Sequence, residues 1–218
     1  MGNLSENSKN YYDENYWYEI FSNAEDFPKL INDFFNKNIF TKKILDAGCG
    51  TGKFSDLFNN ICDDYIGIDK SENQINIAKN KNNLNYIVSD LSNIPLADKN
   101  INISICPWVL GTIEENKRNL VIEELKRVTK DKIILIENLE NSEFEKIRNH
   151  DKDKSTSIYL KYLENKNFKL IKKINSYFLF DSIEIAKETF RNIYNDNISN
   201  NIKSNKIEHK IGIYVLEN

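Results

Sequence analysis

The sequence has few residues of the kinds that build disulfide frameworks and metal sites. Its 218 residues include three cysteines, Cys49, Cys62 and Cys106, and two histidines, His150 and His209. An odd number of cysteines without Cys-x-x-Cys spacing does not suit a disulfide framework, and two distant histidines do not form a ligand cluster. The sequence therefore predicts a protein without structural disulfides and without a bound metal.

Long apolar runs and an excess of one charge are also missing. No apolar stretch reaches the length that crosses a membrane, and the first residues, MGNLSENSKNYYDENYW, contain no apolar leader. The net charge is −3, so the sequence does not indicate the basic surface that binds polyanions. We expect a cytoplasmic protein that binds neither nucleic acid nor a membrane, and no pattern bears on its oligomeric state.

What the chain does have is enough apolar material for one packed α/β domain. Hydrophobic residues make up 40% of it, and its length suits a single domain over residues 1–218. From Lys43 onward short apolar strands alternate with amphipathic helices, a pattern typical of a mostly parallel sheet with helices on both faces. We expect a helical, aromatic cap at 1–40, a core at 43–137, and C-terminal helices and strands at 138–218. The expected strands are 44–47, 65–68, 85–88, 101–105, 132–137 and 211–216.

Several helix starts are visible in the sequence. Ser71, with Gln74 three residues later, forms a capping box that opens a helix through about Lys79. Asp181 and Glu184 are expected to cap a helix further along the chain, at about 181–194. A charged stretch at 142–165 is expected to be helical, and an apolar run follows it at 168–180.

The strongest motif is ILDAGCGTGKF, residues 44–54. An apolar strand ends in Asp46, and Gly48, Gly50 and Gly52 follow at alternate positions before a helix. Glycine suits a backbone that turns sharply and approaches a ligand where a Cβ would collide. The free N–H groups of a following helix suit a carboxylate or a phosphate. A strand, an acid, three alternating glycines and a helix together indicate a nucleotide-type binding loop rather than an ordinary turn.

Two more acids end the next two strands. Asp69 ends YIGID, and Asp90 follows the strand in YIVSDL. In open α/β sheets, ligands bind at the carboxyl edge of the strands, where an acid accepts ribose hydroxyls. Asp90 is placed to accept from an adenine amino group, with Leu91 packed on the ring. Each acid taken alone also fits a helix N-terminus or a turn, but three acids at successive strand ends favour a ligand site.

With these motifs the chain resembles the class I, Rossmann-like S-adenosylmethionine-dependent methyltransferases, in particular their small-molecule branch. LDAGCGTG is similar to the glycine-rich motif of that family, YIGID to its ribose-binding strand, and SDLSNIPLADKNINISIC to its third and fourth strand motifs. The resemblance covers about residues 43–137. It implies a three-layer α/β sandwich with a seven-stranded, mostly parallel sheet whose last strand is antiparallel.

The resemblance also implies a cofactor, S-adenosylmethionine, whose product is S-adenosylhomocysteine. The glycines would pass near its methionine part, Asp46 would act near the methionine amino group, Asp69 would hold the ribose, and Asp90 and Leu91 would hold the adenine. The full set of implied cofactor-binding residues is Asp46, Ala47, Gly48, Gly50, Thr51, Gly52, Asp69, Lys70, Asp90, Leu91 and Cys106.

The chain departs from the family pattern after the fourth strand. CPWVLGTIE stands where many members have a histidine-rich segment, so no residue is assigned as a catalytic base. Methyl transfer from a sulfonium needs a base only when the acceptor must lose a tightly held proton. The looser VTKDKIILIE replaces the family's Pro-Gly-Gly turn and leaves the site unaffected.

Aromatic residues mark the expected substrate side. Trp108 follows the fourth strand, and Tyr16 and Trp17 belong to an aromatic segment that begins at Tyr11 and Tyr12. We expect them to border a small, partly aromatic or apolar acceptor, since such pockets are mostly apolar. Plain packing, under the sheet edge for Trp108 and over the first helix for the segment, is the alternative.

Two other functions stay open at this point. A nicotinamide-dependent oxidoreductase has the G-x-G-x-x-G fingerprint, whose third glycine lies one position later than Gly52. A cofactor-binding regulator or an inactive subunit would keep the whole motif without turnover, because function belongs to the site rather than to the fold.

Overall fold

The computed structural model describes residues 15–26 and 29–218, so Tyr11 and Tyr12 of the expected cap lie outside the described residues. The described chain divides into two compact units. The first, which we call the glycine-loop unit, contains residues 32–137, 167–172 and 212–218. The second, which we call the aromatic unit, contains the described residues up to Ile31 together with 138–166 and 173–211.

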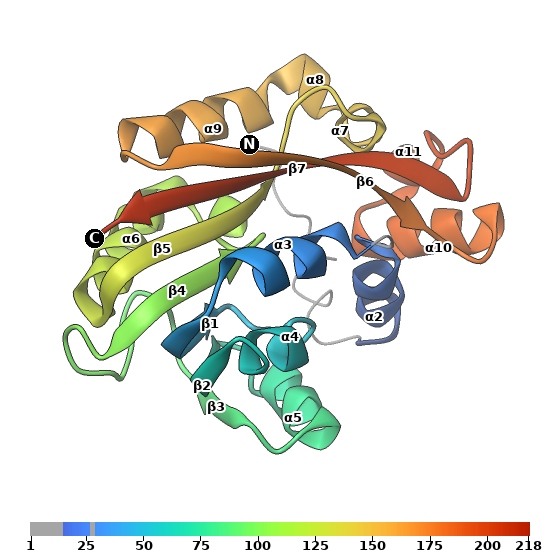
Figure 1. Cartoon of the computed structure of the whole chain (residues 1–218). Coiled ribbons are helices and arrows are strands. Elements are labelled where there is room, and N and C mark those ends of the chain that lie inside the picture. Colours follow the sequence, from blue (N-terminus) through green and yellow to red (C-terminus); the bar gives the residue numbers. More distant parts are fainter. Residues whose placement is uncertain (1–14, 27–28) are drawn as a thin grey trace. The chain divides into compact units, whose positions relative to one another are not determined.

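A seven-stranded sheet runs through the chain in the order β3-β2-β1-β4-β5-β7-β6 (Figure 1). The pairs β1–β2, β2–β3, β1–β4 and β4–β5 are all parallel. The strands are β1 Thr41–Ala47, β2 Cys62–Asp69, β3 Asn85–Val88, β4 Ile101–Pro107, β5 Thr129–Asn138, β6 Lys169–Leu179 and β7 Lys206–Glu217.

The last strand is antiparallel to its neighbour β5. The Leu139 N–H donates to the Lys210 carbonyl at 2.8 Å, and the Asn218 N–H donates to the Asp131 carbonyl at 2.9 Å. Residue numbers therefore rise along one strand while they fall along the other. This confirms the expected Rossmann-like sheet, mostly parallel with an antiparallel last strand.

Several strands are longer than expected at their amino ends. β1 begins at Thr41, β2 at Cys62 and β5 at Thr129, each about three residues before the apolar run. These first residues are largely polar, and all but the buried Thr129 are exposed or half-buried. They still pair through backbone hydrogen bonds, which do not require an apolar side chain.

Helices follow the strands, as α/β alternation requires. In the glycine-loop unit α4 contacts β1 and β2, and α5 contacts β2 and β3. The predicted cap of α5 is present, since the Gln74 N–H donates to Ser71 Oγ at 3.3 Å. The helices are α2 Asn15–Ala24, α3 Leu30–Asn38, α4 Ser55–Asn59, α5 Glu72–Lys81, α6 Glu115–Val128, α7 Glu143–Ile147, α8 His150–Asp153, α9 Ser155–Asn165, α10 Ile183–Ile193 and α11 Asp196–Ser199, with a 3₁₀ turn η1 at Leu110–Thr112.

The segment expected to be one helical stretch at 142–165 is three short helices, α7, α8 and α9. Asn149 and Lys154 separate them, with φ of 61° and 55°. Left-handed residues of this kind interrupt a right-handed helix. Among the described residues no helix is long and apolar enough to cross a membrane.

Phenylalanine side chains build the core of the aromatic unit. Phe21, Phe144, Phe178 and Phe190 are buried together, and Phe21 and Phe178 lie 4.9 Å apart between ring centroids. The apolar run expected at 168–180 supplies Phe178 and Phe180 from β6 and its end. Burial of aromatic surface of this size is the main stabilising term of such a cluster.

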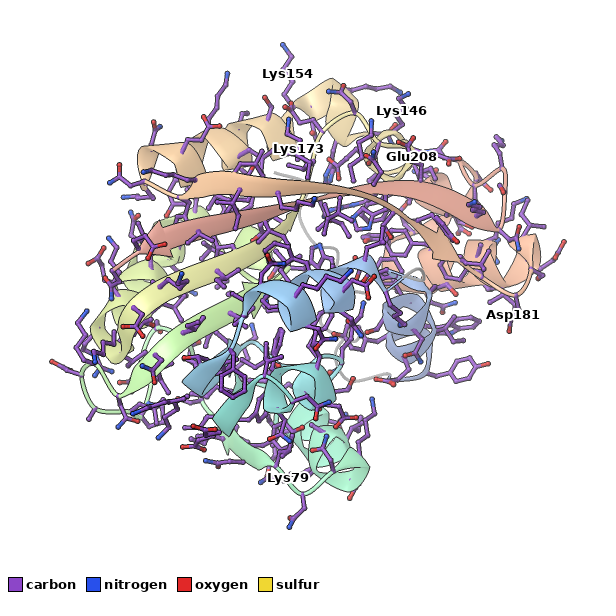
Figure 2. The ribbon with its side chains drawn as sticks, in the orientation of Figure 1. Lys79, Lys146, Lys154, Lys173, Asp181 and Glu208 are labelled. Atoms are coloured by element: carbon purple, nitrogen blue, oxygen red, sulfur yellow. The ribbon has the colours of Figure 1, made fainter. Side chains whose placement is uncertain are left out.

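The cap of α10 differs from the sequence prediction. Ser182, not Asp181, occupies the N-cap position, and its Oγ accepts the Ile185 N–H at 3.2 Å. Asp181 is exposed one residue earlier, and it is labelled next to α10 in Figure 2. The correction has a simple reason: the cap must accept from the N–H three residues on, and only residue 182 has that spacing to residue 185.

We therefore predict that Ser182→Ala lowers the free energy of unfolding by about 0.5–2 kcal/mol, the usual cost of losing an N-cap. Asp181→Ala is the matched control and should change it by less than about 0.5 kcal/mol, as expected of an exposed position. Urea denaturation followed by circular dichroism measures both. Equal losses in the two variants would contradict the assignment of the cap.

Candidate functional site

The glycine loop joins β1 to α4 in the glycine-loop unit. The N–H groups of Gly48 and Cys49 both donate to the Ile68 carbonyl, at 2.7 and 3.0 Å, which ties the loop to β2. Gly48, Gly50 and Gly52 have φ of 79°, 54° and 77°. These left-handed conformations strongly favour glycine, so the alternate spacing of the motif follows from the backbone path.

Close packing adds a second reason for two of these glycines. A Cβ on Gly48 would lie 2.3 Å from Cγ2 of Val109, and one on Gly52 would lie 3.1 Å from Ser55 Oγ and from Tyr86 Oη. The sequence motif suggested a ligand as the object that a Cβ would meet. At Gly48 the protein itself excludes a Cβ, and at Gly52 a Cβ would fit only if Ser55 or Tyr86 moved slightly.

Asp69 fixes the loop from the end of β2. Its Oδ2 accepts the Gly50 N–H at 3.0 Å, and its Oδ1 accepts the Ser71 N–H at 2.9 Å. Burial raises the pKa of Asp69, and the hydrogen bonds from Ser71 and Gly50 limit that rise. A carboxylate has about four lone-pair sites, so this one still has capacity to accept hydroxyl groups.

Asp46 lies at the end of β1 and is almost completely buried, with 1% of its surface exposed. Its Oδ2 accepts the Tyr65 hydroxyl at 3.0 Å, whereas its Oδ1 is buried and has no hydrogen-bond partner within the described part of the chain. Burial raises the pKa of Asp46 to about 7; the Tyr65 hydrogen bond opposes the rise and the negative charge of Asp69 adds to it. A buried carboxylate oxygen of this kind suits a cationic or hydrogen-donating ligand group.

Tyr65, Gly67 and Tyr86 were not singled out from the sequence. A Cβ on Gly67 would lie 2.8 Å from the Tyr65 hydroxyl oxygen and 2.7 Å from Cδ1 of Tyr86. A glycine inside a strand commonly marks such a close approach, so Gly67 in YIGID was the available signal. The motif does not show which side chains cover Gly67, because that depends on the register of β2 with β3.

Asp90 and Leu91 lie just after β3. Asp90 is exposed, and its Oδ1 accepts both the N–H and the hydroxyl of Ser92, at 2.8 and 2.7 Å. The pKa of Asp90 is lowered mainly by the Ser92 N–H. Leu91 is buried. Asp90 therefore stabilises the turn after β3, as the alternative interpretation expected. Both of these hydrogen bonds use Oδ1, and neither uses Oδ2.

Trp108 lies directly after β4 with a φ of 53°, a conformation that costs energy for a bulky residue. Its ring stacks on Phe54, 5.9 Å between centroids, and Lys53 Nζ lies 5.0 Å from the ring centroid. The Trp108 ring therefore has a packing role, and the side chain is still only half-buried. Cys106, two residues earlier, is fully buried, and burial raises the pKa of its thiol, which excludes it as a nucleophile at neutral pH.

The remaining predicted residues divide between the two units. Ala47 and Thr51 are buried beside the loop and Lys70 is exposed after Asp69. Tyr16 and Trp17 belong to the aromatic unit, where Trp17 packs against the phenylalanine core and Tyr16 is exposed. Among the residues that the structure describes, no group of three acids, cysteines or histidines is arranged to hold a metal.

The glycine-loop unit thus brings together at the carboxyl ends of adjacent parallel strands what the motifs predicted: the loop, Asp46, Asp69 and Asp90. The loop offers backbone, Asp69 retains acceptor capacity, and the buried Oδ1 of Asp46 lacks a partner. These features fit a nucleoside that carries a cationic side chain, as S-adenosylmethionine does.

Comparison with known proteins agrees with this geometry. A family model described as a methyltransferase domain matches residues 44–132. The malonyl-[acyl-carrier protein] O-methyltransferase of Buchnera aphidicola is 36% identical over 96 residues, which cover 43% of this chain and 38% of that protein. The tRNA (carboxymethyluridine(34)-5-O)-methyltransferase of Arabidopsis thaliana is 41% identical over 88 residues, 40% of this chain and 21% of that protein.

Among solved structures, magnesium protoporphyrin IX methyltransferase from Synechocystis PCC 6803 with bound S-adenosylhomocysteine has a TM-score of 0.58 at 15% identity. The match covers 90% of this chain and 85% of that one, and it shows the shared fold. The matched regions span well under two thirds of the two curated relatives. The family model assigns a methyltransferase domain to residues 44–132, and the glycine-loop motif and the shared Rossmann-like fold agree with it.

Proposed function

We propose that this protein transfers the methyl group of S-adenosylmethionine to a small-molecule acceptor by in-line displacement, in the cytoplasm. The observation that carries the proposal is the grouping of the glycine loop with Asp46, Asp69 and Asp90 at adjacent strand ends. A nicotinamide-dependent oxidoreductase is disfavoured by the glycine spacing and by the family match.

Each residue of the site has a proposed role. The loop from Gly48 to Gly52 would lie along the methionine part of the cofactor, and Asp46 would face its ammonium group. Asp69 would accept from the ribose hydroxyls while it keeps its bonds to the loop. Asp90 would accept from the adenine amino group through the oxygen that Ser92 does not use. Ala47, Thr51, Lys70, Leu91 and Cys106 would complete the surroundings.

The bound cofactor supplies a methyl group on a sulfonium, which is a good leaving group. The tasks left to the chain are alignment of the acceptor with that methyl and exclusion of water, which together supply much of the acceleration in such displacements. Trp108, held by Phe54 and Lys53, is the proposed wall of the acceptor pocket. No residue of this chain is assigned as a base.

The small-molecule acceptor is supported by composition and by the residues after β4. The net charge of −3 provides no large basic surface for counterion release, which drives nucleic-acid affinity. Cys106-Pro107-Trp108-Val109 stands where amino-group DNA methyltransferases carry Asn-Pro-Pro-Tyr. The two curated relatives differ in acceptor, one named for an acyl-carrier protein and one for tRNA, so the acceptor requires a direct test.

That test is a labelled-methyl assay. The protein is incubated with methyl-labelled S-adenosylmethionine and cell extract separated into nucleic-acid, protein and small-metabolite fractions, with chelator present. Label is expected in the metabolite fraction. Label mainly in nucleic acid or protein would overturn the proposed acceptor. Cofactor binding without transfer to any fraction would favour a regulator or an inactive subunit.

We predict that Asp69→Ala weakens S-adenosylmethionine binding by about 1–3 kcal/mol, the range for hydrogen bonds to a charged group. The loss combines the ribose contacts with release of the Gly50 and Ser71 N–H groups. Titration calorimetry measures it. Asp63→Ala, on an exposed position of the same strand, is the control and should bind normally. A folded Asp69→Ala variant with unchanged affinity would show that the ribose is held elsewhere.

We predict that Trp108→Ala lowers kcat by about tenfold or more, because misplacement of an acceptor by about 1 Å costs up to about 100-fold. The cofactor Kd should change far less. Trp108→Phe, which keeps an aromatic ring, is the control and should retain most of the turnover. A Trp108→Ala variant that loses cofactor affinity and kcat in proportion would assign the ring to the cofactor or to the fold.

A further inference from the structure

Asp46 and Tyr65 meet because of their positions on neighbouring strands. In the parallel register of β1 and β2, Asp46 lies opposite Gly67, and Tyr65 is two residues earlier on the same face of β2. Diagonal neighbours of this kind are within reach of a long aromatic side chain. The Tyr65 ring leans along the strand over Gly67, and its hydroxyl reaches Asp46 Oδ2 at 3.0 Å.

Gly67 makes this contact possible. A Cβ at that position would lie 2.8 Å from the Tyr65 hydroxyl oxygen, closer than a real Cβ approaches another atom. Tyr65 and Asp46 are 3% and 1% exposed, so both side chains are packed within the core. The pair is therefore a built feature of the core rather than a surface contact.

Among the described titratable groups that act on Asp46, none is a cation that would compensate its charge. Of those groups only Asp69 carries a charge near neutral pH, and that charge is negative. The groups are Tyr65 and Asp69 on β2, Tyr86 on β3, Cys106 on β4 and Cys49 in the glycine loop. An ionised Asp46 accepts the Tyr65 hydroxyl at Oδ2, while its Oδ1 has no hydrogen-bond partner within the described residues.

We propose that Tyr65 is a positioning residue that holds the Asp46 carboxylate ionised and oriented, so that the site selects ligands with a methionine-type ammonium group. The inference rests on the proposed function, since it concerns the same cofactor site. The hydroxyl donates to one oxygen and favours the charged form of the carboxyl group. The other oxygen then attracts the cation, an interaction that is strong in a buried site.

The proposal gives cofactor binding a pH dependence with a defined sign. The pKa of Asp46 is raised to about 7 by burial, opposed by the Tyr65 hydrogen bond. Binding an ammonium group requires the ionised form, so affinity is constant above about pH 7 and falls as the pH decreases below it, by up to about tenfold per pH unit. Without the Tyr65 hydroxyl the pKa of Asp46 rises further, and the decline begins at a higher pH.

The experiment measures binding of S-adenosylhomocysteine and of 5′-methylthioadenosine by titration calorimetry between pH 5.5 and 8.5. The second ligand lacks the amino and carboxyl groups of methionine. The variants are Tyr65→Phe and, as a matched control, Tyr86→Phe, whose lost hydroxyl donates to Asn82 rather than to Asp46. Both variants keep their rings, and circular dichroism verifies their folds.

For the wild type we expect S-adenosylhomocysteine affinity to fall on the acid side of about pH 7, and 5′-methylthioadenosine affinity to stay flat. Tyr65→Phe should shift the onset of this fall to higher pH and weaken S-adenosylhomocysteine binding at pH 7 by about tenfold, as expected for a lost hydrogen bond to a charged group. Tyr86→Phe should leave the onset unchanged.

The outcomes distinguish the positioning role of Tyr65 from the proposed function. Suppose that the wild type binds S-adenosylhomocysteine but that Tyr65→Phe has the same pH profile as the wild type or as Tyr86→Phe. The positioning role of Tyr65 is then wrong, and the proposed function stands. If both ligands respond equally to pH, selection of the ammonium by Asp46 is wrong. If the wild type binds neither ligand at any pH, the proposed function itself fails.

Discussion

The carboxylate of Asp69 links the two segments between which a nucleoside would lie. One oxygen accepts an N–H from the glycine loop after β1, and the other accepts an N–H at the start of α5 after β2. The loop is also bound to β2 through the Ile68 carbonyl. Because the glycines of this loop have left-handed backbone conformations, it has little intrinsic preference for its shape and depends on these bonds to keep it. The close contact of Val109 with Gly48 depends on this fixed position of the loop.

The cofactor half of the site and the expected acceptor residues differ in how they are built. The proposed cofactor residues come from one compact unit and from strand ends, where a parallel sheet repeats the same geometry from strand to strand. Tyr16 and Trp17 come from the other unit, whose core consists of phenylalanine side chains. This is consistent with relatives that share the domain and differ in their named acceptors.

The sequence predicted those parts of the structure that depend on short-range patterns. The glycine loop, the strand-end acids and the Ser71 cap are present, because periodicity and spacing encode them directly. The antiparallel last strand was implied by the family resemblance and is also present. The breaks at Asn149 and Lys154 were missed, since neither residue type ends a helix by itself.

The contact of Tyr65 with Asp46 was missed for a different reason: it joins residues 19 positions apart, and it depends on the register of β1 against β2. Register is not visible in either strand alone. The choice of Ser182 over Asp181 required knowing the first turn of α10 to within one residue, and helix boundaries are the least certain part of any pattern.

Gly67 also has a consequence for how this sequence is free to vary over time. The space above its backbone is shared by the hydroxyl of Tyr65 and the ring of Tyr86, which come from two different strands. A side chain at position 67 would therefore be compatible only with smaller residues at both other positions. A larger residue at position 67 therefore requires changes at positions 65 and 86 as well, so the geometry couples the three positions.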